Sequence, residues 1–95
     1  MKVIWNNQVI AESDQTKVVE GNHYFPPDSI KKHFFEHNDK ETFCPWKGKA
    51  SYYDLSHNDS IVQAAAWYYP EPKDAASDIK DFVAFDKSAV AIKDD

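Results

Sequence analysis

Two aromatic-rich runs constrain the fold of this chain more than any other feature. Residues 44–53 have the sequence CPWKGKASYY and residues 64–72 have the sequence AAAWYYPEP, and together they hold two of the three tryptophans and four of the five tyrosines. Because aromatic residues fit the pleated surface of a sheet, the runs predict strands over residues 49–56 and 61–69. The polar residues 57–60 between them predict a turn, and the prolines that follow end the second strand.

Side chains on a strand point alternately to opposite faces of the sheet. Tyr52 and Tyr53 should therefore face opposite ways, and Tyr68 should be separated from Trp67 and Tyr69. One set is expected to build the core and the other a surface or cleft. The polar tips of tyrosine and tryptophan suit a half-wet pocket, although a core with a cross-strand aromatic ladder is the more ordinary alternative.

The remainder of the chain predicts short strands and turns. Further strands are expected over residues 3–5, 8–11, 16–20, 23–25, 82–85 and 89–92. Asn6 and Asn7 tolerate positive φ and should close the first two strands into a hairpin. Short strands at intervals of about 8–12 residues are typical of a small antiparallel barrel or sandwich. A chain of 95 residues is expected to form a single domain, residues 1–95.

One helix is predicted in this mainly β chain. Asp28 follows two prolines and is a suitable N-cap, and Ile30, Phe34 and His37 would share one face of a helix. We therefore expect one short α-helix near residues 28–37. It would be only two to three turns long, so that packing and not propensity would have to stabilise it.

The charge balance limits the partners of the chain. It carries 16 acidic and 11 basic residues, and every basic residue is a lysine. Arginine supplies the forked contacts to phosphates and guanine edges, so we expect no nucleic-acid partner. No apolar run has the length of a signal peptide or of a membrane span, so we expect a cytoplasmic protein with no membrane partner. We further expect a monomer or weak homodimer.

The pattern His33-Phe34-Phe35-Glu36-His37 matches the H-x-x-E-H motif of some zinc peptidases. Histidines at i and i+4 on a helix can share one zinc ion, and Cys44 could join His33 and His37 in a mixed site. No further ligand can be named, and an ordinary amphipathic helix is the more common explanation of such a short pattern. We therefore predict no metal site and no cofactor.

Cys44 and Lys47 are the residues of the first run with chemical potential. A single cysteine excludes an intramolecular disulfide, but a nearby lysine favours the reactive thiolate. The alternative is that Cys44 is a small buried apolar group. Lys47 could hold an anionic ligand as a point charge, or it could be a solvated residue of the turn at Gly48. Two glycines in the whole chain exclude the glycine-rich phosphate loops.

The strings CPWKGKASYY at residues 44–53 and AWYYPEP at residues 66–72, with Tyr24-Phe25-Pro26 before them, resemble the family called domain of unknown function 427. The resemblance covers nearly the whole chain. It implies a β-tent (Mss4-like) fold, similar to methionine sulfoxide reductase B and the ligand-binding domain of cereblon. The paired zinc-binding cysteines of such folds are absent here.

The resemblance also implies a ligand site in the concave cleft. The matching positions, taken as ligand-binding, are Tyr24, Cys44, Lys47, Tyr52, Trp67 and Tyr69. The family is also labelled nucleotidyltransferase-like, but the chain has neither a Gly-Ser turn nor a D-x-D triplet. Asp81 stands where relatives often have glycine, and Asp86 where an aromatic residue is common.

These observations predict a domain that binds an unidentified small molecule in an aromatic-lined cleft. Two alternatives stay open. One is an enzyme that uses nucleotidyl transfer or cysteine chemistry, although no complete catalytic constellation is present. The other is a protein-interaction module, which would need a contiguous exposed apolar patch.

Overall fold

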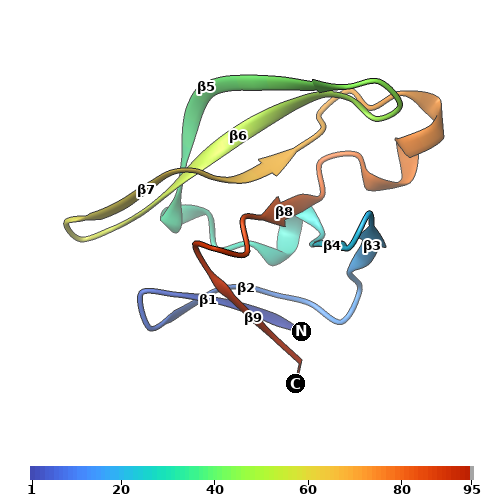
Figure 1. Ribbon diagram of the computed structural model, residues 1–95. Coiled ribbons are helices and arrows are strands. Elements are labelled where there is room, and N and C mark those ends of the chain that lie inside the picture. Colours follow the sequence, from blue (N-terminus) through green and yellow to red (C-terminus); the bar gives the residue numbers. More distant parts are fainter. Residues whose placement is uncertain (95) are drawn as a thin grey trace.

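The computed structural model describes residues 1–94, and antiparallel strands make up most of it, as the sequence predicts (Figure 1). The strands are β1 (Lys2–Trp5), β2 (Gln8–Glu12), β3 (Lys17–Val19), β4 (Asn22–Tyr24), β5 (Phe35–Cys44), β6 (Gly48–His57), β7 (Ser60–Tyr68), β8 (Val83–Phe85) and β9 (Ala91–Lys93). Three short 3-10 helices join them: η1 (Pro27–Ser29), η2 (Lys32–Phe34) and η3 (Asp74–Ile79).

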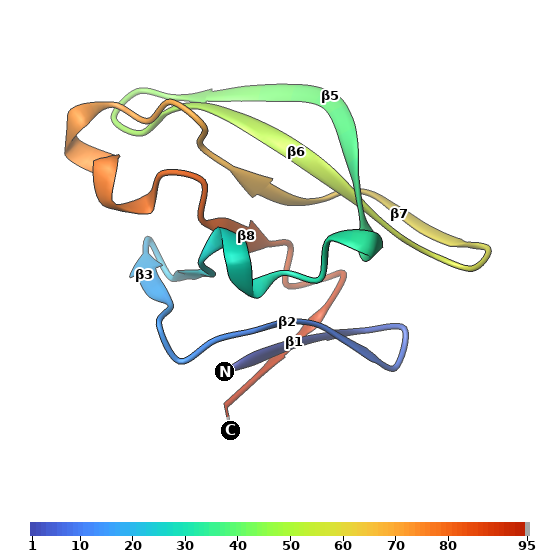
Figure 2. The same ribbon diagram turned by 180° about the vertical axis from the view of Figure 1, so that it is seen from behind.

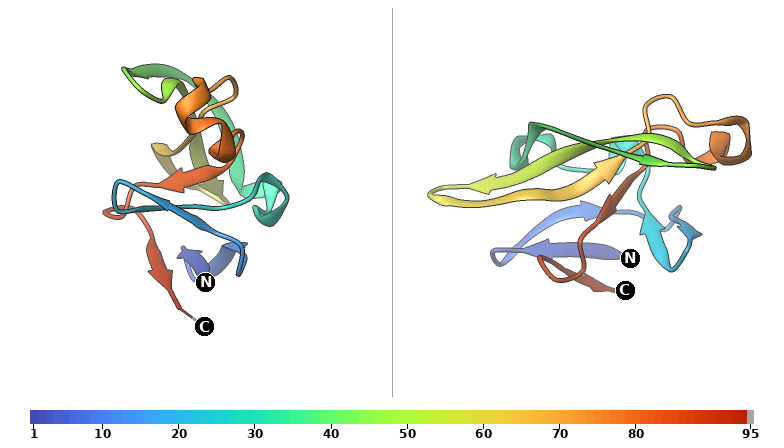
Figure 3. Two further views of the ribbon diagram at one scale, coloured as in Figure 1. Left: turned by 90° about the vertical axis from the view of Figure 1, so that its right-hand side faces the viewer. Right: turned by 45° about the horizontal axis from the view of Figure 1, so that its top comes forward.

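The strands form two packed layers and a separate hairpin. A three-stranded sheet in the order β2-β1-β9 lies below a four-stranded sheet in the order β5-β6-β7-β8, and β3 pairs with β4 at the side (Figures 1 and 3). Within the described residues the four-stranded sheet ends at β5 and β8 without closing on itself. The arrangement is therefore a small open sandwich and not a closed barrel, and the finer β-tent likeness stays a prediction.

The predicted hairpins form where turn residues permit them. Asn6 and Asn7 join β1 to β2 with φ of 53° and 62°, and Asn58 joins β6 to β7 with φ of 55°. Asparagine enters this left-handed region more readily than most residues, so its position fixes both turns.

The prediction of an α-helix near residues 28–37 is wrong. That segment contains the single turns η1 and η2 and then the beginning of β5, and it links the two layers (Figure 2). Ile30 pairs with Ala11 in an isolated bridge, and Phe35 pairs with Leu55 of β6. Sheet pairing at both ends draws the backbone into an extended form, which overrides the helical spacing of the apolar residues.

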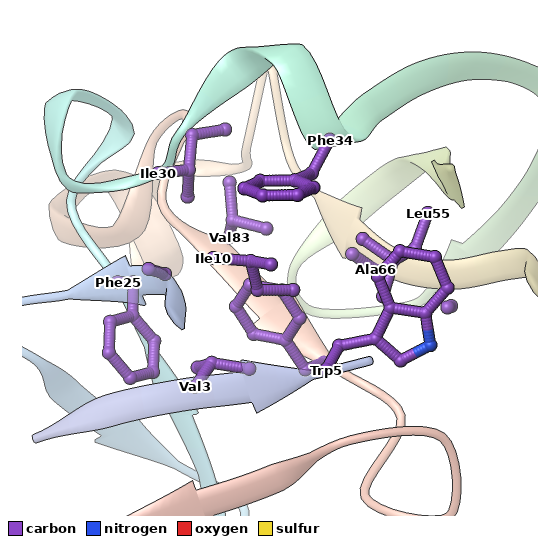
Figure 4. Packing of buried hydrophobic residues seen from close by; sticks show 12 residues of the cluster. Val3, Trp5, Ile10, Phe25, Ile30, Phe34, Leu55, Ala66 and Val83 are labelled. Carbon is purple, nitrogen blue, oxygen red and sulfur yellow. The ribbon is translucent and has the colours of Figure 1, made fainter. Parts of the chain in front are cut away.

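The core lies between the two layers, where apolar side chains of both sheets meet (Figure 4). Val3 and Ile10 come from the lower sheet, and Leu55 comes from the upper sheet; all three are fully buried. Phe25 and Phe85 meet edge to face with ring centroids 5.7 Å apart. Rings in this geometry contribute about 0.5–1.5 kcal/mol beyond the area that they bury. Within residues 1–94 no helix has the length and apolar character needed to span a membrane.

Candidate functional site

A cavity of about 580 Å³ lies on the side of the four-stranded sheet that bears the β3–β4 hairpin. Its lining comes from five strands, the β5–β6 turn, the residue after β7 and the loop after β8: Asn22, Tyr24, Lys40, Lys47, Tyr52, Ala64, Trp67, Tyr69, Phe85, Asp86, Lys87 and Ser88. The volume falls in the range of about 300–1,000 Å³ that is usual for small-molecule sites.

Aromatic side chains with polar tips form the wall of this cavity. Tyr52 of β6 and Trp67 of β7 are paired across the two strands with ring centroids 6.4 Å apart. The Trp67 indole donates a hydrogen bond of 3.2 Å to the Tyr24 hydroxyl. Burial raises the pKa of Tyr69 to about 12, although the nearby Lys47 opposes that shift. The Tyr69 hydroxyl is therefore protonated at neutral pH and available as a hydrogen-bond donor.

The alternation predicted for these strands is confirmed. Tyr53 and Tyr68 stack with centroids 4.7 Å apart and pack against the main core. Tyr52 and Trp67 pack with a second cluster that includes Tyr24 and Tyr69. The two adjacent tyrosines of each run thus serve opposite faces of the sheet.

Lys47 is the one buried charged side chain within the described part of the chain, with 6% of its surface exposed. Its ammonium binds the carboxylate of Glu20, from the β3–β4 turn, as a hydrogen bond and ion pair. The same ammonium lies 5.1 Å from the centre of the Trp46 ring and 5.7 Å from that of Tyr69. A buried cation is held here by one counter-ion and by ring faces.

The pKa values of this pair move apart. Burial acts to lower the pKa of Lys47, but the hydrogen bond to Glu20 and weaker contributions from neighbouring groups outweigh it, so the pKa lies above the ordinary 10.5. The same hydrogen bond is the main cause that lowers the pKa of Glu20 below 4.5, with a smaller contribution from Trp46. Both groups are charged at neutral pH.

Gly48 fixes the direction in which Lys47 points. Its φ is +109°, and a β-carbon built there would lie 3.4 Å from the carbonyl oxygen of Glu71. The backbone carbonyl of Lys47 accepts a hydrogen bond of 2.9 Å from the amide of Lys73. Only glycine adopts this conformation freely, so the turn can pack against residues 71–73 and present Lys47 to the cavity.

Two β-bulges shape the cavity wall. The register between β5 and β6 passes from Asn38 to Glu41, so that Asp39 and Lys40 form an insertion in β5. The register between β6 and β7 passes from the pair Tyr53–Ala66 to the pair Leu55–Val62, so that residues 63–65 lie opposite a single residue of β6. Ala64, at the centre of these three residues, has a φ of +53°. Bulges re-aim side chains and store local strain, and these two place Lys40 and Ala64 in the cavity lining.

A chain of hydrogen bonds across β6 joins the two bulges. The Asn38 side-chain amide donates to Asp54 at 2.7 Å, and the backbone amide of Ala64 donates to the same carboxylate oxygen at 2.8 Å. The backbone amide of Lys40 donates to the Asn38 side-chain oxygen at 2.7 Å. Asp54 and Asn38 thus satisfy backbone groups that the sheet ladder leaves unpaired.

The structure brings five of the six predicted site residues together around one cavity: Tyr24, Lys47, Tyr52, Trp67 and Tyr69. Cys44 is not among the lining residues. It ends β5 opposite Gly48 and packs, half-buried, against the second cluster. The role of these residues in binding a ligand stays a prediction.

A family model described as a domain of unknown function (DUF427) matches residues 1–95. The chain belongs to this family. No curated protein matches the chain. Membership confirms the resemblance carried by the two aromatic runs, and it leaves the activity open because the description of the family gives no function.

The resemblance leads us to expect glycine in relatives at position 81, where this chain has aspartate, and the backbone of this chain is compatible with that expectation. Asp81 has a φ of +64°, in the left-handed region that favours glycine. Its backbone amide donates a hydrogen bond of 3.1 Å to the Tyr69 carbonyl, which holds the turn before β8. Aspartate is among the residues that accept this conformation, so the turn survives the change.

Sequence reasoning missed two lysines of the cavity. Lys40 sits in the β5 bulge, with its ammonium 4.8 Å from the centre of the Tyr52 ring. Lys87 follows β8 and donates a hydrogen bond of 3.1 Å to the Gly21 carbonyl. Asp86, noted only as a departure from the family, also lines the cavity, and its hydrogen bonds with Ser88 lower its pKa. The position of Lys40 depends on a β-bulge, and no local sequence pattern predicts where this bulge forms.

The suggested metal site at His33 and His37 is not supported. The helix that would align these residues is absent, and they lie on η2 and β5. His33 lies against the Phe34 ring, and His37 pairs with Asp39 at 3.2 Å. Within residues 1–94 no group of three or more histidine, cysteine, aspartate or glutamate side chains is placed to hold a metal ion.

Proposed function

We propose that this domain binds a small organic molecule in the cavity between β6–β7 and the β3–β4 hairpin. The observation that carries the proposal is the pairing of half-exposed Tyr52 and Trp67 on the wall of a cavity of about 580 Å³. Ring faces that water can reach are available to a flat apolar ligand.

The surroundings of these rings support the proposal. Tyr24 and Tyr69 are buried and line the same cavity, and the Trp67 indole is fixed by its hydrogen bond to Tyr24. A ring that is already held in place loses little side-chain entropy when a ligand packs on it, so the wall is pre-organised. The hydroxyl of Tyr52 is also fixed, by a hydrogen bond of 2.9 Å with Thr42.

The proposal includes the assignment of the chain to the β-tent fold. In a β-tent fold the ligand would occupy the concave side of the main sheet, and the cavity lies between one side of β5–β8 and the β3–β4 hairpin. This is an analogy of fold, so it adds weight to the location of the site and none to the identity of the ligand.

A fragment screen by two-dimensional NMR tests the proposal directly. The three indole N–H signals report separate places, because Trp5 is in the core, Trp46 is in the exposed β5–β6 turn and Trp67 lines the cavity. We expect bound fragments to shift the Trp67 signal and the amides near Tyr52, and the Trp67→Leu variant to lose that binding while it stays folded.

The control is the Trp46→Leu variant, which removes an indole outside the cavity lining and should keep the fragment-induced shifts of Trp67. A screen in which no fragment moves the Trp67 signal, or in which shifts gather only around Trp46, would contradict the proposal. Native mass spectrometry of freshly purified protein would add the mass of any retained ligand.

A further inference from the structure

The cavity carries an excess of positive side chains although the chain is acidic. Its lining contains Lys40, Lys47 and Lys87 against the carboxylate of Asp86, and Glu20, which is outside the lining, neutralises Lys47 in the free protein. The whole chain carries 16 acidic and 11 basic residues. Like charges gathered in a concave site with low-dielectric walls concentrate the field, so the cavity attracts anions that the rest of the surface repels.

The counter-ion of the buried Lys47 is a side chain that is itself exposed to solvent. A buried ammonium requires a negative partner, because the loss of hydration is otherwise uncompensated. Glu20 supplies it, yet 54% of the Glu20 side chain is exposed, against 8% for Lys47. If Glu20 moved away, its carboxylate would regain water at once, whereas Lys47 would need another anion.

Glu20 is held in an unfavourable backbone conformation. It occupies the two-residue β3–β4 turn with Gly21, and their φ values are +52° and +80°. Glycine, asparagine and aspartate are preferred where a turn requires positive φ, and glutamate lacks the short side chain that eases it. Such strain gathers at functional sites, and here it keeps a carboxylate over the cavity lysine.

We infer that the ligand is a small organic anion with a flat ring, and that its negative group replaces the Glu20 carboxylate at Lys47. This inference rests on the proposed function and names the chemical class of its ligand. The ring packs against Tyr52 and Trp67, and the anionic group takes the place that Glu20 holds in the free protein.

The neighbouring cations fit the same ligand. Lys40 lies over the Tyr52 ring at 4.8 Å, and Lys87 holds the carbonyl of Gly21 at 3.1 Å. Both ammonium groups can turn toward an added negative charge, because a lysine side chain has several rotatable bonds. A carboxylate and a phosphate ester satisfy this chemistry equally, and the experiment distinguishes them.

The chain contains a matched pair of residues for the test. Lys49 and Glu41 form an ion pair at 3.6 Å in which 64% and 54% of the side chains are exposed. Neither residue lines the cavity. Lys47→Met and Lys49→Met therefore remove the same charge inside and outside the site, and Glu20→Gln and Glu41→Gln do so for the carboxylates.

The probes are benzoate with its neutral counterpart benzamide, AMP with its neutral counterpart adenosine, and inorganic phosphate alone. Each is titrated at fixed ionic strength while the Trp67 indole signal is followed by NMR. We expect the anionic member of a pair to bind about 10- to 100-fold more tightly than the neutral one, the range for a charge-assisted hydrogen bond. The pair in which the anion gains more affinity over its neutral counterpart identifies the phosphate or the carboxylate as the recognised group.

The variants should separate the two lysines. Lys47→Met is expected to remove most of the preference for the anion and to leave binding of the neutral probe unchanged, whereas Lys49→Met changes anion affinity by less than about threefold. Glu20→Gln removes the internal competitor and should tighten anion binding several-fold, and Glu41→Gln should not. The Glu20→Gln result stands even if Lys47→Met fails to fold.

Several results would overturn the inference. If neutral and anionic probes bind equally well, the inference is wrong and the proposed function still stands. The same conclusion follows if fragments bind in the cavity and none of these anions does. Inorganic phosphate that binds as tightly as AMP, and equally well in Trp67→Leu when the amide signals near Tyr52 are followed, would indicate an adventitious ion only. If neither fragments nor anions shift Trp67, the proposed function and the inference fail together.

Discussion

On one face of the β6–β7 hairpin, Tyr53 and Tyr68 stack 4.7 Å apart against the main core, whereas on the other face Tyr52 and Trp67 stand 6.4 Å apart beside the cavity. The four residues come from the same two strands and differ only in the direction of the side chain. The pleat of the sheet therefore directs one aromatic pair toward the main core and the other toward the cavity.

The residues behind the two faces differ in the same way. The main core uses phenylalanines, such as Phe25, Phe35 and Phe85, which meet edge to face and have no polar atoms to satisfy. The cavity side uses Tyr24 and Tyr69, whose hydroxyls lie near Lys47 or the Trp67 indole. A phenylalanine needs no hydrogen-bond partner in a core, whereas the tyrosines of the cavity side keep their hydroxyls beside polar neighbours.

The largest expected effect belongs to the main core. Phe25→Ala removes a fully buried ring that packs on Phe85, and we expect the free energy of unfolding to fall by about 3–5 kcal/mol. Urea denaturation measures this loss. Tyr52→Ala, on the cavity side, removes a half-exposed ring and should have a clearly smaller effect; equal losses would remove the distinction between the faces.

The second effect concerns the link between the bulges. Asp54→Ala removes the acceptor for the Asn38 amide and for the backbone amide of Ala64, and we expect a loss of about 1–3 kcal/mol. The amide signals of Lys40 and Ala64 should both move in the NMR spectrum, although they lie on different strands. A change confined to one bulge would show that the two are independent.

A smaller effect is expected for the buried hydroxyl of the cavity wall. Tyr24→Phe deprives the Trp67 indole of its acceptor and should lower stability by about 0.5–1.5 kcal/mol, with a shift of the Trp67 indole signal. Tyr52→Phe is the control, because its hydrogen bond with Thr42 is exposed and water can replace it. Equal losses of stability in the two variants would contradict a stabilising role for the buried hydrogen bond.

The smallest effect is a dependence on pH. The hydrogen bond from Lys47 lowers the pKa of Glu20 below 4.5, and a carboxyl with a lowered pKa stabilises the fold above pH 4.5 and loses that contribution as pH falls through its folded value. The raised pKa of Lys47 stabilises the fold below pH 10.5, and this stabilisation is lost as the pH rises through the pKa of Lys47 in the folded protein.

Thermal unfolding of the wild type and of Glu20→Gln checks this prediction. The difference in Tm should be constant between about pH 6 and 9 and should disappear in acid below the folded pKa of Glu20. High salt should reduce it, because Glu20 is exposed. A difference that persists in acid would assign the effect of the substitution to the backbone of the turn and not to the ion pair.

Much of the fold could be predicted because local chemistry determines it. The asparagines at 6, 7 and 58 accept the positive φ of hairpin turns, and alternation along β6 and β7 separates Tyr52 from Tyr53. The segment 28–37 was misassigned because the spacing of Ile30 and Phe34 also fits a helix. The bridge from Ile30 to Ala11, far away in the sequence, decided its conformation.

The cavity was predicted in part for the same reason. Tyr52 and Trp67 follow from strand alternation, but Lys40 reaches the site through a bulge whose partner, Asp54, lies on another strand. Lys87 lies in the loop after β8, where the regular alternation of a strand is absent and the spacing of residues does not predict where a side chain points. Cys44 is adjacent to the site in sequence and is still not part of the lining, since the turn at Gly48 and not proximity brings Lys47 inward.

One carboxylate, that of Asp54, holds a bulge on each neighbouring strand through Asn38 and the amide of Ala64. A substitution of either Asn38 or Asp54 leaves the polar group of the other without its hydrogen-bond partner, so natural selection would rarely accept one change alone. We therefore expect positions 38 and 54 to covary among members of the family, and an alignment in which they vary independently would contradict this. The cavity wall would then be inherited as a unit, and new ligand preferences would arise first at Lys40, Lys47 and Lys87, whose replacement leaves that unit intact.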